Sequence, residues 1–213
     1  MNMKQLVKPM ASAGIFLVLL LFTWQKSHAQ TMGSMTDPRD GQDYKTVSYD
    51  NVLSDTSVTW MAENLNYKIP GSYVYDNKEE LRAKIGLLYT WEAAMKACPK
   101  GWHLPSDNEW EMLVDKFGGY EKAGKALKSK KGWAEVNGTN SSGFNAIPAG
   151  YRATDGSFDY LDRFGFWWSS TDAGEDEAWT RYLYWYNSKV FRNANPKSNA
   201  GSCRCVQDIA PVK

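Results

Sequence analysis

The clearest pattern along the chain is a repeat of apolar residues at helical spacing, which occurs twice between residues 90 and 118. In the first repeat, one face of a 3.6-residue period carries Trp91, Ala94, Met95 and Cys98. Thr90 precedes this face and can cap a helix, and Pro99 ends it. The pattern therefore predicts a helix over residues 91–98.

The second repeat has a stronger start signal. Ser106 and Glu109 form a capping box, in which the Ser hydroxyl accepts from the third amide and the Glu carboxylate reaches back. Glycines 118 and 119 stop the helix. Its apolar face consists of Trp110, Leu113, Val114 and Phe117. A shorter helix is predicted around residues 122–128.

The rest of the chain alternates β-rich segments with clusters of Gly, Asn and Asp, which is typical of strands joined by turns. The predicted strands cover residues 44–49, 58–62, 87–89, 166–169, 179–186, 189–192 and 202–207. Helices concentrate in the first half and strands in the second. This distribution predicts an α+β domain.

The N-terminus has the pattern of a secretory signal peptide. Lys4 and Lys8 precede an apolar run over residues 13–22, and the small-residue site Ser27-His28-Ala29 follows. We therefore expect a signal peptide over residues 1–29 and export to the periplasm, the cell surface or the medium; a retained N-terminal anchor is the alternative. Polar residues 30–43 predict a flexible leader, residues 44–208 one domain, and residues 209–213 a tail.

Composition narrows the possible partners. The formal net charge of +1 gives no electrostatic case for binding nucleic acid. After the apolar run near the N-terminus, no stretch approaches the length of a transmembrane helix. The unusual number is the aromatic content of 14%, with 10 Trp and 12 Tyr. This excess is the feature that a functional interpretation must explain.

Several longer motifs occur in a fixed order along the chain: WMAENLNY (60–67), LYTWEAAMKACPKGWHLPSDNEWEML (88–113), FNAIPAGYR (144–152), DGSF (155–158), FWWSST (166–171) and RCVQD (204–208). Together they strongly resemble the Fibrobacter succinogenes major paralogous domain family of Gram-negative bacteria, which is distantly similar to the C-type lectin-like superfamily. The resemblance covers nearly all of residues 44–208. It implies a C-type lectin-like fold, with two N-terminal helices on a twisted antiparallel sheet with long loops. It implies little about activity.

Three cysteines in an exported protein suggest one disulfide and one remaining thiol, and three pairings are possible. The resemblance implies the pairing, because Cys98 and Cys205 match the lectin-like bridge between a helix end and the final strand. Cys203 is then either a buried free thiol or the site of an intermolecular disulfide. The chain would accordingly be a monomer or a dimer through Cys203.

The sequence offers no recognised catalytic machinery, so we expect no enzyme. Residues 30–213 contain a single histidine, His103, which directly precedes the second predicted helix and is interpreted as structural. Motifs for a nucleophilic serine, a zinc peptidase and a phosphate-binding loop are absent from the sequence. No cofactor is predicted.

Acidic residues in turns are weak calcium candidates, because Ca²⁺ prefers several loop oxygens. The cluster consists of Asp155, Asp159 and Asp162. The calcium-dependent sugar site of lectins would need motifs that this chain lacks, since Asn195-Pro196-Lys197 and Trp168-Ser169-Ser170 replace its ligands. A solvated loop is the simpler interpretation, and we predict no metal.

The strand over residues 179–186 concentrates the unexplained rings. Alternation places Trp179, Arg181, Leu183 and Trp185 on one face and Thr180, Tyr182, Tyr184 and Tyr186 on the other. The strand is either buried on both faces or exposes one face as a ligand platform. The candidate ligand-binding residues are Tyr151, Arg152, Arg181, Tyr182, Tyr184, Trp185 and Tyr186.

Three functions follow from these observations. The first is an exported, non-enzymatic binding module of the cell envelope, which recognises an extracellular or periplasmic glycan or protein. The second is a structural or adhesin-like surface subunit with no small ligand. The third is an enzyme that acts on polysaccharide through Asp155 or Asp159.

Overall fold

In the computed structural model, which describes residues 30–50 and 57–208, the two capped helices form where the sequence predicts them. Helix α2 (Trp91–Ala97) begins after Thr90, whose hydroxyl accepts a hydrogen bond from the Ala93 amide. Helix α3 (Asp107–Lys116) begins after Ser106, and both halves of the capping box with Glu109 are present. Local sequence signals therefore determine both helix starts.

Of the other helical segments, one was predicted from the sequence and two were not. Helix α4 (Ala123–Leu127) lies within the predicted range of residues 122–128. Helix α1 (Glu79–Ile85) and the short 3₁₀ segment η1 (Tyr75–Asn77) were not predicted. Helix α1 has no fully buried residue, and its apolar side consists only of the half-buried Leu81 and Ile85, so its helical periodicity is weak.

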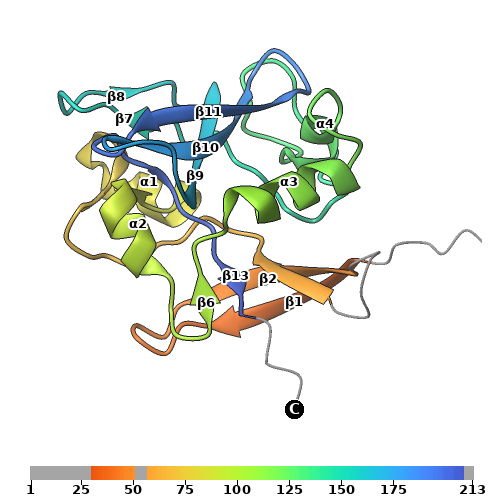
Figure 1. Cartoon of the computed structure of the whole chain (residues 1–213), viewed down its shortest axis with the longest axis horizontal. Coiled ribbons are helices and arrows are strands. Elements are labelled where there is room, and N and C mark those ends of the chain that lie inside the picture. The colour runs from red at the N-terminus through yellow and green to blue at the C-terminus, as the bar shows by residue number, and fades with distance from the viewer. Residues whose placement is uncertain (1–29, 51–56, 209–213) are drawn as a thin grey trace, which may run out of the picture.

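One sheet lies on the N-terminal side of the fold and is entirely antiparallel. Its strands, in spatial order, are β1 (Gln30–Thr36), β2 (Asp43–Asp50), β3 (Ser57–Met61), β13 (Val206–Gln207) and β6 (Trp102–His103). The C-terminal strand β13 therefore lies between two strands from the first half of the chain. Figure 1 shows this sheet at one end of the molecule, with β1 at its edge.

Strand β1 corrects the expectation of a flexible leader over residues 30–43. Residues 30–36 pair with residues 43–49 in a continuous antiparallel register, and residues 37–42 form the connecting turn. In this turn Asp37 is fully buried and accepts hydrogen bonds from the side chain and the amide of Arg39. The sequence did not predict β1, because its residues are mostly polar and an edge strand with exposed side chains lacks an apolar pattern.

A second, mixed sheet occupies the opposite end of the molecule (Figure 1). Its strands, in spatial order, are β11 (Val190–Pro196), β10 (Glu177–Tyr184), β9 (Phe164–Asp172), β12 (Gly201–Ser202), β5 (Leu88–Tyr89) and β4 (Ser72–Tyr73). Only the β12–β9 pair is parallel. A separate two-stranded hairpin consists of β7 (Tyr151–Arg152) and β8 (Phe158–Asp159). The fold is thus α+β, as predicted, but it has several sheets rather than one.

The helices and sheets meet around an interior cluster of aromatic rings. Trp60, Trp110, Phe144 and Trp167 are almost completely buried, with ring centroids between 4.8 and 6.4 Å apart. They come from β3, α3, the loop before β7, and β9, so one cluster joins both sheets to a helix. Burial of such large rings is a major source of folding free energy.

Two buried basic residues organise the loop-rich part of the chain. Arg204 lies 4.2 Å from the Phe144 ring centre and donates to Asn64 Oδ1 at 2.9 Å, to the Asn145 carbonyl at 2.8 Å and to the Phe144 carbonyl. Lys128 Nζ donates to the carbonyls of Val136, Tyr184 and Asn187. Apart from Tyr184, which ends β10, the residues whose backbone carbonyls accept these bonds lie in irregular segments.

The expected signal peptide over residues 1–29 and the expected tail over residues 209–213 lie outside the described residues.

Candidate ligand-binding site

Aromatic side chains gather on one face of the second sheet and reach the surface. We define this aromatic patch by six residues: Tyr151, Tyr160, Phe164, Tyr184, Tyr186 and Phe191. Neighbouring ring centroids lie 5.1 to 6.2 Å apart, and two pairs are stacked, Tyr151 with Tyr160 and Tyr184 with Tyr186. The rings therefore form one continuous group rather than isolated surface residues.

Strand register brings most of the patch together. Phe164 of β9 lies opposite Tyr184 of β10, and Tyr182 lies opposite Phe191 of β11. Because side chains alternate along a strand, Tyr184 lies on the same face as Tyr182. Three strands thereby contribute aromatic rings to one face of the sheet.

The β7–β8 hairpin adds Tyr151 from the side. Gly150 directly before it has a φ of 65°, and a Cβ at this position would collide with the carbonyl oxygen of Asp159. The Gly150 amide donates to the Phe164 carbonyl at 2.7 Å, which ties the hairpin to β9. Glycine at position 150 is therefore needed to place Tyr151 against Phe164.

The patch is the outer end of a larger aromatic array. At its inner end Phe166, Trp168 and Tyr182 are buried in the core. At its outer end Tyr160 is 51% exposed and Tyr186 is 48% exposed. The four other members of the patch are half-buried. Rigid core packing therefore holds the exposed rings in position.

The tyrosine hydroxyls of the patch are free to bind other groups. Within the described part of the chain, the hydroxyls of Tyr151, Tyr160, Tyr184 and Tyr186 form no hydrogen bond. Burial raises the pKa of Tyr151 and Tyr184, so both hydroxyls stay protonated at neutral pH. The patch thus offers four hydroxyl groups, and a tyrosine hydroxyl can both donate and accept a hydrogen bond.

Two of the predicted ligand-binding residues are interior residues, which corrects their assignment. Arg181 is 1% exposed and forms an ion pair with Asp107 at 2.5 Å and a hydrogen bond with the Tyr120 hydroxyl at 3.1 Å. Tyr182 is buried between Phe164 and Phe191. Strand β10 is covered on both faces at its centre, as one of the two interpretations expected, and its two ends reach solvent.

The remaining predicted residues lie at or beside the patch. Tyr151, Tyr184 and Tyr186 belong to it, and Trp185 contacts Tyr186 while its N–H donates to Glu135 at 3.1 Å. Arg152 is half-buried, with its guanidinium 4.2 Å from the Tyr73 ring centre.

Three members of the patch were missed: Tyr160, Phe164 and Phe191. The positions of Phe164 and Phe191 depend on the β9–β10–β11 register, which no local pattern in the sequence specifies, and Tyr160 lies in the turn between β8 and β9.

The predicted calcium candidates do not converge. Asp155 accepts two hydrogen bonds from Ser157, which lower the pKa of its carboxyl group. Asp162 lies 3.8 Å from Arg163, and both are exposed. Within residues 30–50 and 57–208, three carboxylates do not gather closely enough to hold a metal ion. The acidic turn therefore borders the patch without forming a preformed cation site.

A polar cavity lies near the first sheet, distinct from the patch. It has a volume of about 230 Å³ and is lined by polar residues of β2, α1 and the loop after β3, among them Glu63, Asn66 and Arg82. Arg82 donates to the side chain and the carbonyl of Asn66, at 2.8 and 3.1 Å. These groups satisfy each other, so the cavity gives no sign of a specific ligand.

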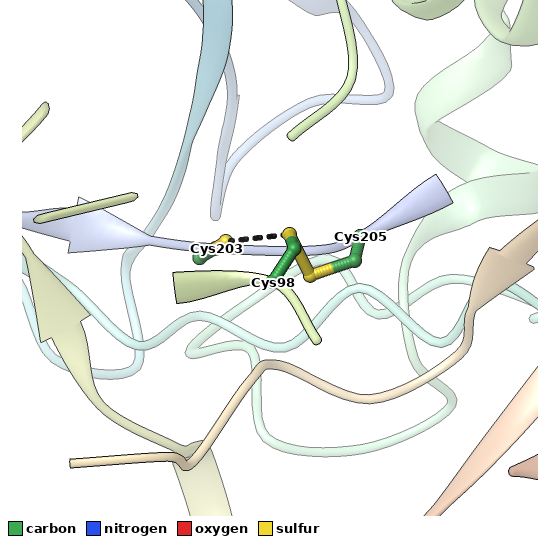
Figure 2. Close-up of side chains that lie close together, drawn as sticks. All are labelled: Cys98, Cys203 and Cys205. Carbon is green, nitrogen blue, oxygen red and sulfur yellow. Dashed lines mark hydrogen bonds between the residues drawn. A yellow bond between two sulfur atoms is a disulfide. The ribbon is translucent and has the colours of Figure 1, made fainter. Parts of the chain in front are cut away.

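The cysteines are arranged as the resemblance implies. Cys98 and Cys205 form a disulfide with a Cα–Cα distance of 5.8 Å, and Cys203 is a free, fully buried thiol (Figure 2). Burial raises the pKa of the Cys203 thiol to about 12. A dimer through Cys203 would require this part of the core to open.

Comparison with known families identifies the class of protein. The family model described as the Fibrobacter succinogenes major domain matches residues 56–207. This match covers more than half of the chain, so the protein belongs to that family. Comparisons with curated proteins and with solved structures gave no match. Among the described residues, no helix is both long and apolar enough to cross a membrane.

Proposed function

We propose that this protein is an exported, non-enzymatic binding module of the bacterial envelope, which recognises a glycan through the aromatic patch. The observation that carries the proposal is a continuous group of six aromatic rings, held by the core, whose four tyrosine hydroxyls have no hydrogen-bond partner among the described residues. The N-terminal sequence pattern supports export.

Sugar rings combine apolar C–H faces with hydroxyl groups, and the patch offers a matching combination. Its exposed ring faces suit apolar contact, and its hydroxyls both donate and accept hydrogen bonds. Because the rings are fixed by packing against Phe166 and Tyr182, little conformational entropy is lost on binding. A preorganised surface of this kind suits ligands that are themselves polar and flexible.

A protein ligand is the second candidate. Tyrosine, tryptophan and arginine are enriched at protein-interface hot spots. Arg163 is exposed beside the patch, with its guanidinium 5.8 Å from the Trp185 ring centre. The structural-subunit function expected from the sequence would use this same surface for protein contact.

We infer that the fold is a divergent C-type lectin-like fold. The supporting observations are the disulfide from the end of α2 to the segment before β13, and the two capped helices α2 and α3.

Polysaccharide hydrolysis is a weaker proposal. A glycosidase needs one carboxylic acid that stays protonated at working pH. Hydrogen bonds from Ser157 lower the pKa of Asp155 instead, so this carboxylate is ionised at neutral pH. We therefore expect no release of reducing ends from polysaccharide.

The test is binding of the purified protein to a glycan array and to insoluble envelope polysaccharides. Tyr186→Ala removes the most accessible ring of the β10 end and should weaken glycan binding by about tenfold, as expected for a hot-spot residue. Tyr186→Phe keeps the ring and removes the hydroxyl, and should have a smaller effect. Met112→Ala on α3 is the control, because Met112 is 41% exposed and lies outside the patch.

Each outcome has a clear meaning. Equal glycan binding by the wild type and Tyr186→Ala would contradict the use of the patch. Failure of the wild type on all glycans, together with Tyr186-dependent retention of an envelope protein, would favour the second candidate. Failure on both kinds of ligand would reject the binding function.

A further inference from the structure

Three sulfur atoms lie together where α2 ends and β13 begins. Cys98 follows α2, and Cys203 and Cys205 lie between β12 and β13. The Cys98 and Cys205 sulfurs are bonded at 2.07 Å, and the Cys203 sulfur lies 3.9 Å from that of Cys98. All three lie within 4.8 Å of one another (Figure 2).

The disulfide does not account for the third cysteine. Cys203 is 0% exposed, and the Cys98 sulfur is its only side-chain hydrogen-bonding neighbour among the described residues. An alanine or valine would fill a buried apolar position without adding a thiol beside a disulfide. Packing alone therefore does not explain why a thiol lies at position 203, and the aromatic patch does not explain it either.

We propose that Cys98, Cys203 and Cys205 bind one thiophilic divalent cation, such as Zn²⁺, when the disulfide is reduced. A dithiol reductant supplies two electrons and two protons, so that it is oxidised to its own disulfide while Cys98 and Cys205 become thiols. The cation then replaces the three thiol protons, which are released to solvent, and forms three metal–sulfur bonds.

The geometry of the sulfurs fits this ion. Zn–S bonds of about 2.3 Å place the sulfurs of a tetrahedral site about 3.8 Å apart. The distance of 3.9 Å between the Cys98 and Cys203 sulfurs meets this requirement. After reduction, the Cys205 sulfur has to move away from Cys98, which rotation about its Cα–Cβ bond allows.

The backbone holds two of the three ligands without help from the disulfide. The carbonyl of Cys203 accepts a hydrogen bond from the Leu65 amide at 2.8 Å, and that of Cys205 accepts one from the Met61 amide at 2.9 Å. Cutting the disulfide leaves both bonds intact. The Cys203–Cys205 segment therefore stays in place, and α2 brings the third sulfur.

The chemistry of the ligands selects the ion class. Thiolates are soft ligands and favour Zn²⁺, Cd²⁺ and similar ions over Ca²⁺ or Mg²⁺. Three thiolates around a divalent ion leave one net negative charge, whereas a monovalent ion would leave two. A divalent ion is therefore easier to accommodate in a buried site.

The experiment is a Cd²⁺ titration of the full chain, reduced with a phosphine under anaerobic conditions. We expect one Cd²⁺ per chain, with a thiolate-to-cadmium charge-transfer band and an unchanged near-ultraviolet circular dichroism spectrum. The oxidised protein should show no band. Reduced Cys203→Ala retains two thiols, and its affinity should fall at least about tenfold, or 1.4 kcal/mol.

Equal Cd²⁺ affinity of the reduced wild type and reduced Cys203→Ala would overturn the proposal, as would the absence of the band. If reduction alone unfolds the wild type, Cd²⁺ should restore its near-ultraviolet spectrum but not that of Cys203→Ala. Failure to restore the wild-type spectrum would also overturn the proposal. None of these outcomes depends on glycan binding.

Discussion

The interior aromatic cluster and the aromatic patch are both groups of packed rings, Trp and Phe in the cluster and Tyr and Phe in the patch, but they differ in how their polar groups are paired. In the interior, the Trp110 N–H donates to the Trp168 carbonyl at 3.2 Å, and the Trp167 N–H donates to Asn64 Oδ1 at 3.0 Å. In the patch, the tyrosine hydroxyls have no partner among the described residues.

This difference separates the large aromatic content into two populations. The first holds the fold together, and the N–H groups of Trp110, Trp167 and Trp168 are satisfied internally, because an unpaired buried group is costly. The second is attached to the fold but leaves its hydrogen bonds to solvent or to a ligand. Only the second population calls for an external partner.

The largest expected effect concerns Arg204, which supports the interior cluster. Arg204→Met removes the donors to the Phe144 and Asn145 carbonyls, whereas Asn64 Oδ1 keeps its bond from Trp167; each buried acceptor that loses its donor costs about 1–3 kcal/mol. Relief of the desolvation of a buried guanidinium, which lowers the pKa of Arg204 to about 9, offsets part of this loss. We expect a decrease of about 3 kcal/mol in the free energy of unfolding, measured by urea denaturation.

Arg163→Met is the matched control, because Arg163 is exposed beside the patch and its ion pair with Asp162 is long, at 3.8 Å. Its free energy of unfolding should stay within about 0.5 kcal/mol of the wild type. If both substitutions had the same effect, the proposed distinction between interior and patch would be wrong.

A single hydroxyl provides a more sensitive test. Tyr49 is buried, and its hydroxyl donates to the Ser142 carbonyl at 2.9 Å, whereas the Tyr184 hydroxyl has no described partner. Tyr49→Phe should lower the free energy of unfolding by about 1–2 kcal/mol, because the Ser142 carbonyl becomes unpaired. Tyr184→Phe should change it by less than about 0.5 kcal/mol. A clear destabilisation by Tyr184→Phe would show that this hydroxyl is structural.

The sequence predicted those parts of the fold that depend on local signals. The caps at Thr90 and Ser106 and the apolar stripes of α2 and α3 lie within a few residues of each other, so one window of sequence contains the whole signal. Strand β1 is an exposed edge strand without an apolar pattern, and the apolar side of α1 consists only of the half-buried Leu81 and Ile85. Strand β1 forms by pairing with the neighbouring strand β2, and α1 packs Leu81 and Ile85 against a core cluster that includes Ala149 and Ala200.

The same limit applies to the candidate site. Tyr151, Tyr184 and Tyr186 stood out because they lie in or near an aromatic strand, but Phe164 and Phe191 join them only through strand register. Alternation along β10 identified its two faces correctly. It could not reveal that α3 supplies Asp107 to bury Arg181. The Cys98–Cys205 pair came from the resemblance to a family and not from the spacing of the cysteines.

The smallest expected effect concerns His103, a polar residue that is partly exposed, like the tyrosines of the patch, but has hydrogen-bond partners, like the interior residues. His103 lies between Asp208 and Glu109, at 2.7 and 2.9 Å. Burial alone lowers the pKa of His103, but the hydrogen bonds and charges of the two carboxylates outweigh it and raise the pKa above its usual value. The folded state therefore binds the proton more tightly than the unfolded state, so the stabilisation is complete below the unfolded pKa of about 6.5 and is lost as the pH rises through the folded value.

Because the His103 side chain is 41% exposed, solvent screens the interaction and its contribution should be about 0.5 kcal/mol. The free energy of unfolding should fall by this amount between about pH 6 and pH 9, relative to His103→Gln, which keeps one donor and one acceptor but cannot become charged. Parallel pH profiles for the two proteins would show that pairing stabilises this domain only in its interior. A difference would show that His103, unlike the tyrosines of the patch, is already engaged in holding β6, α3 and the end of β13 together.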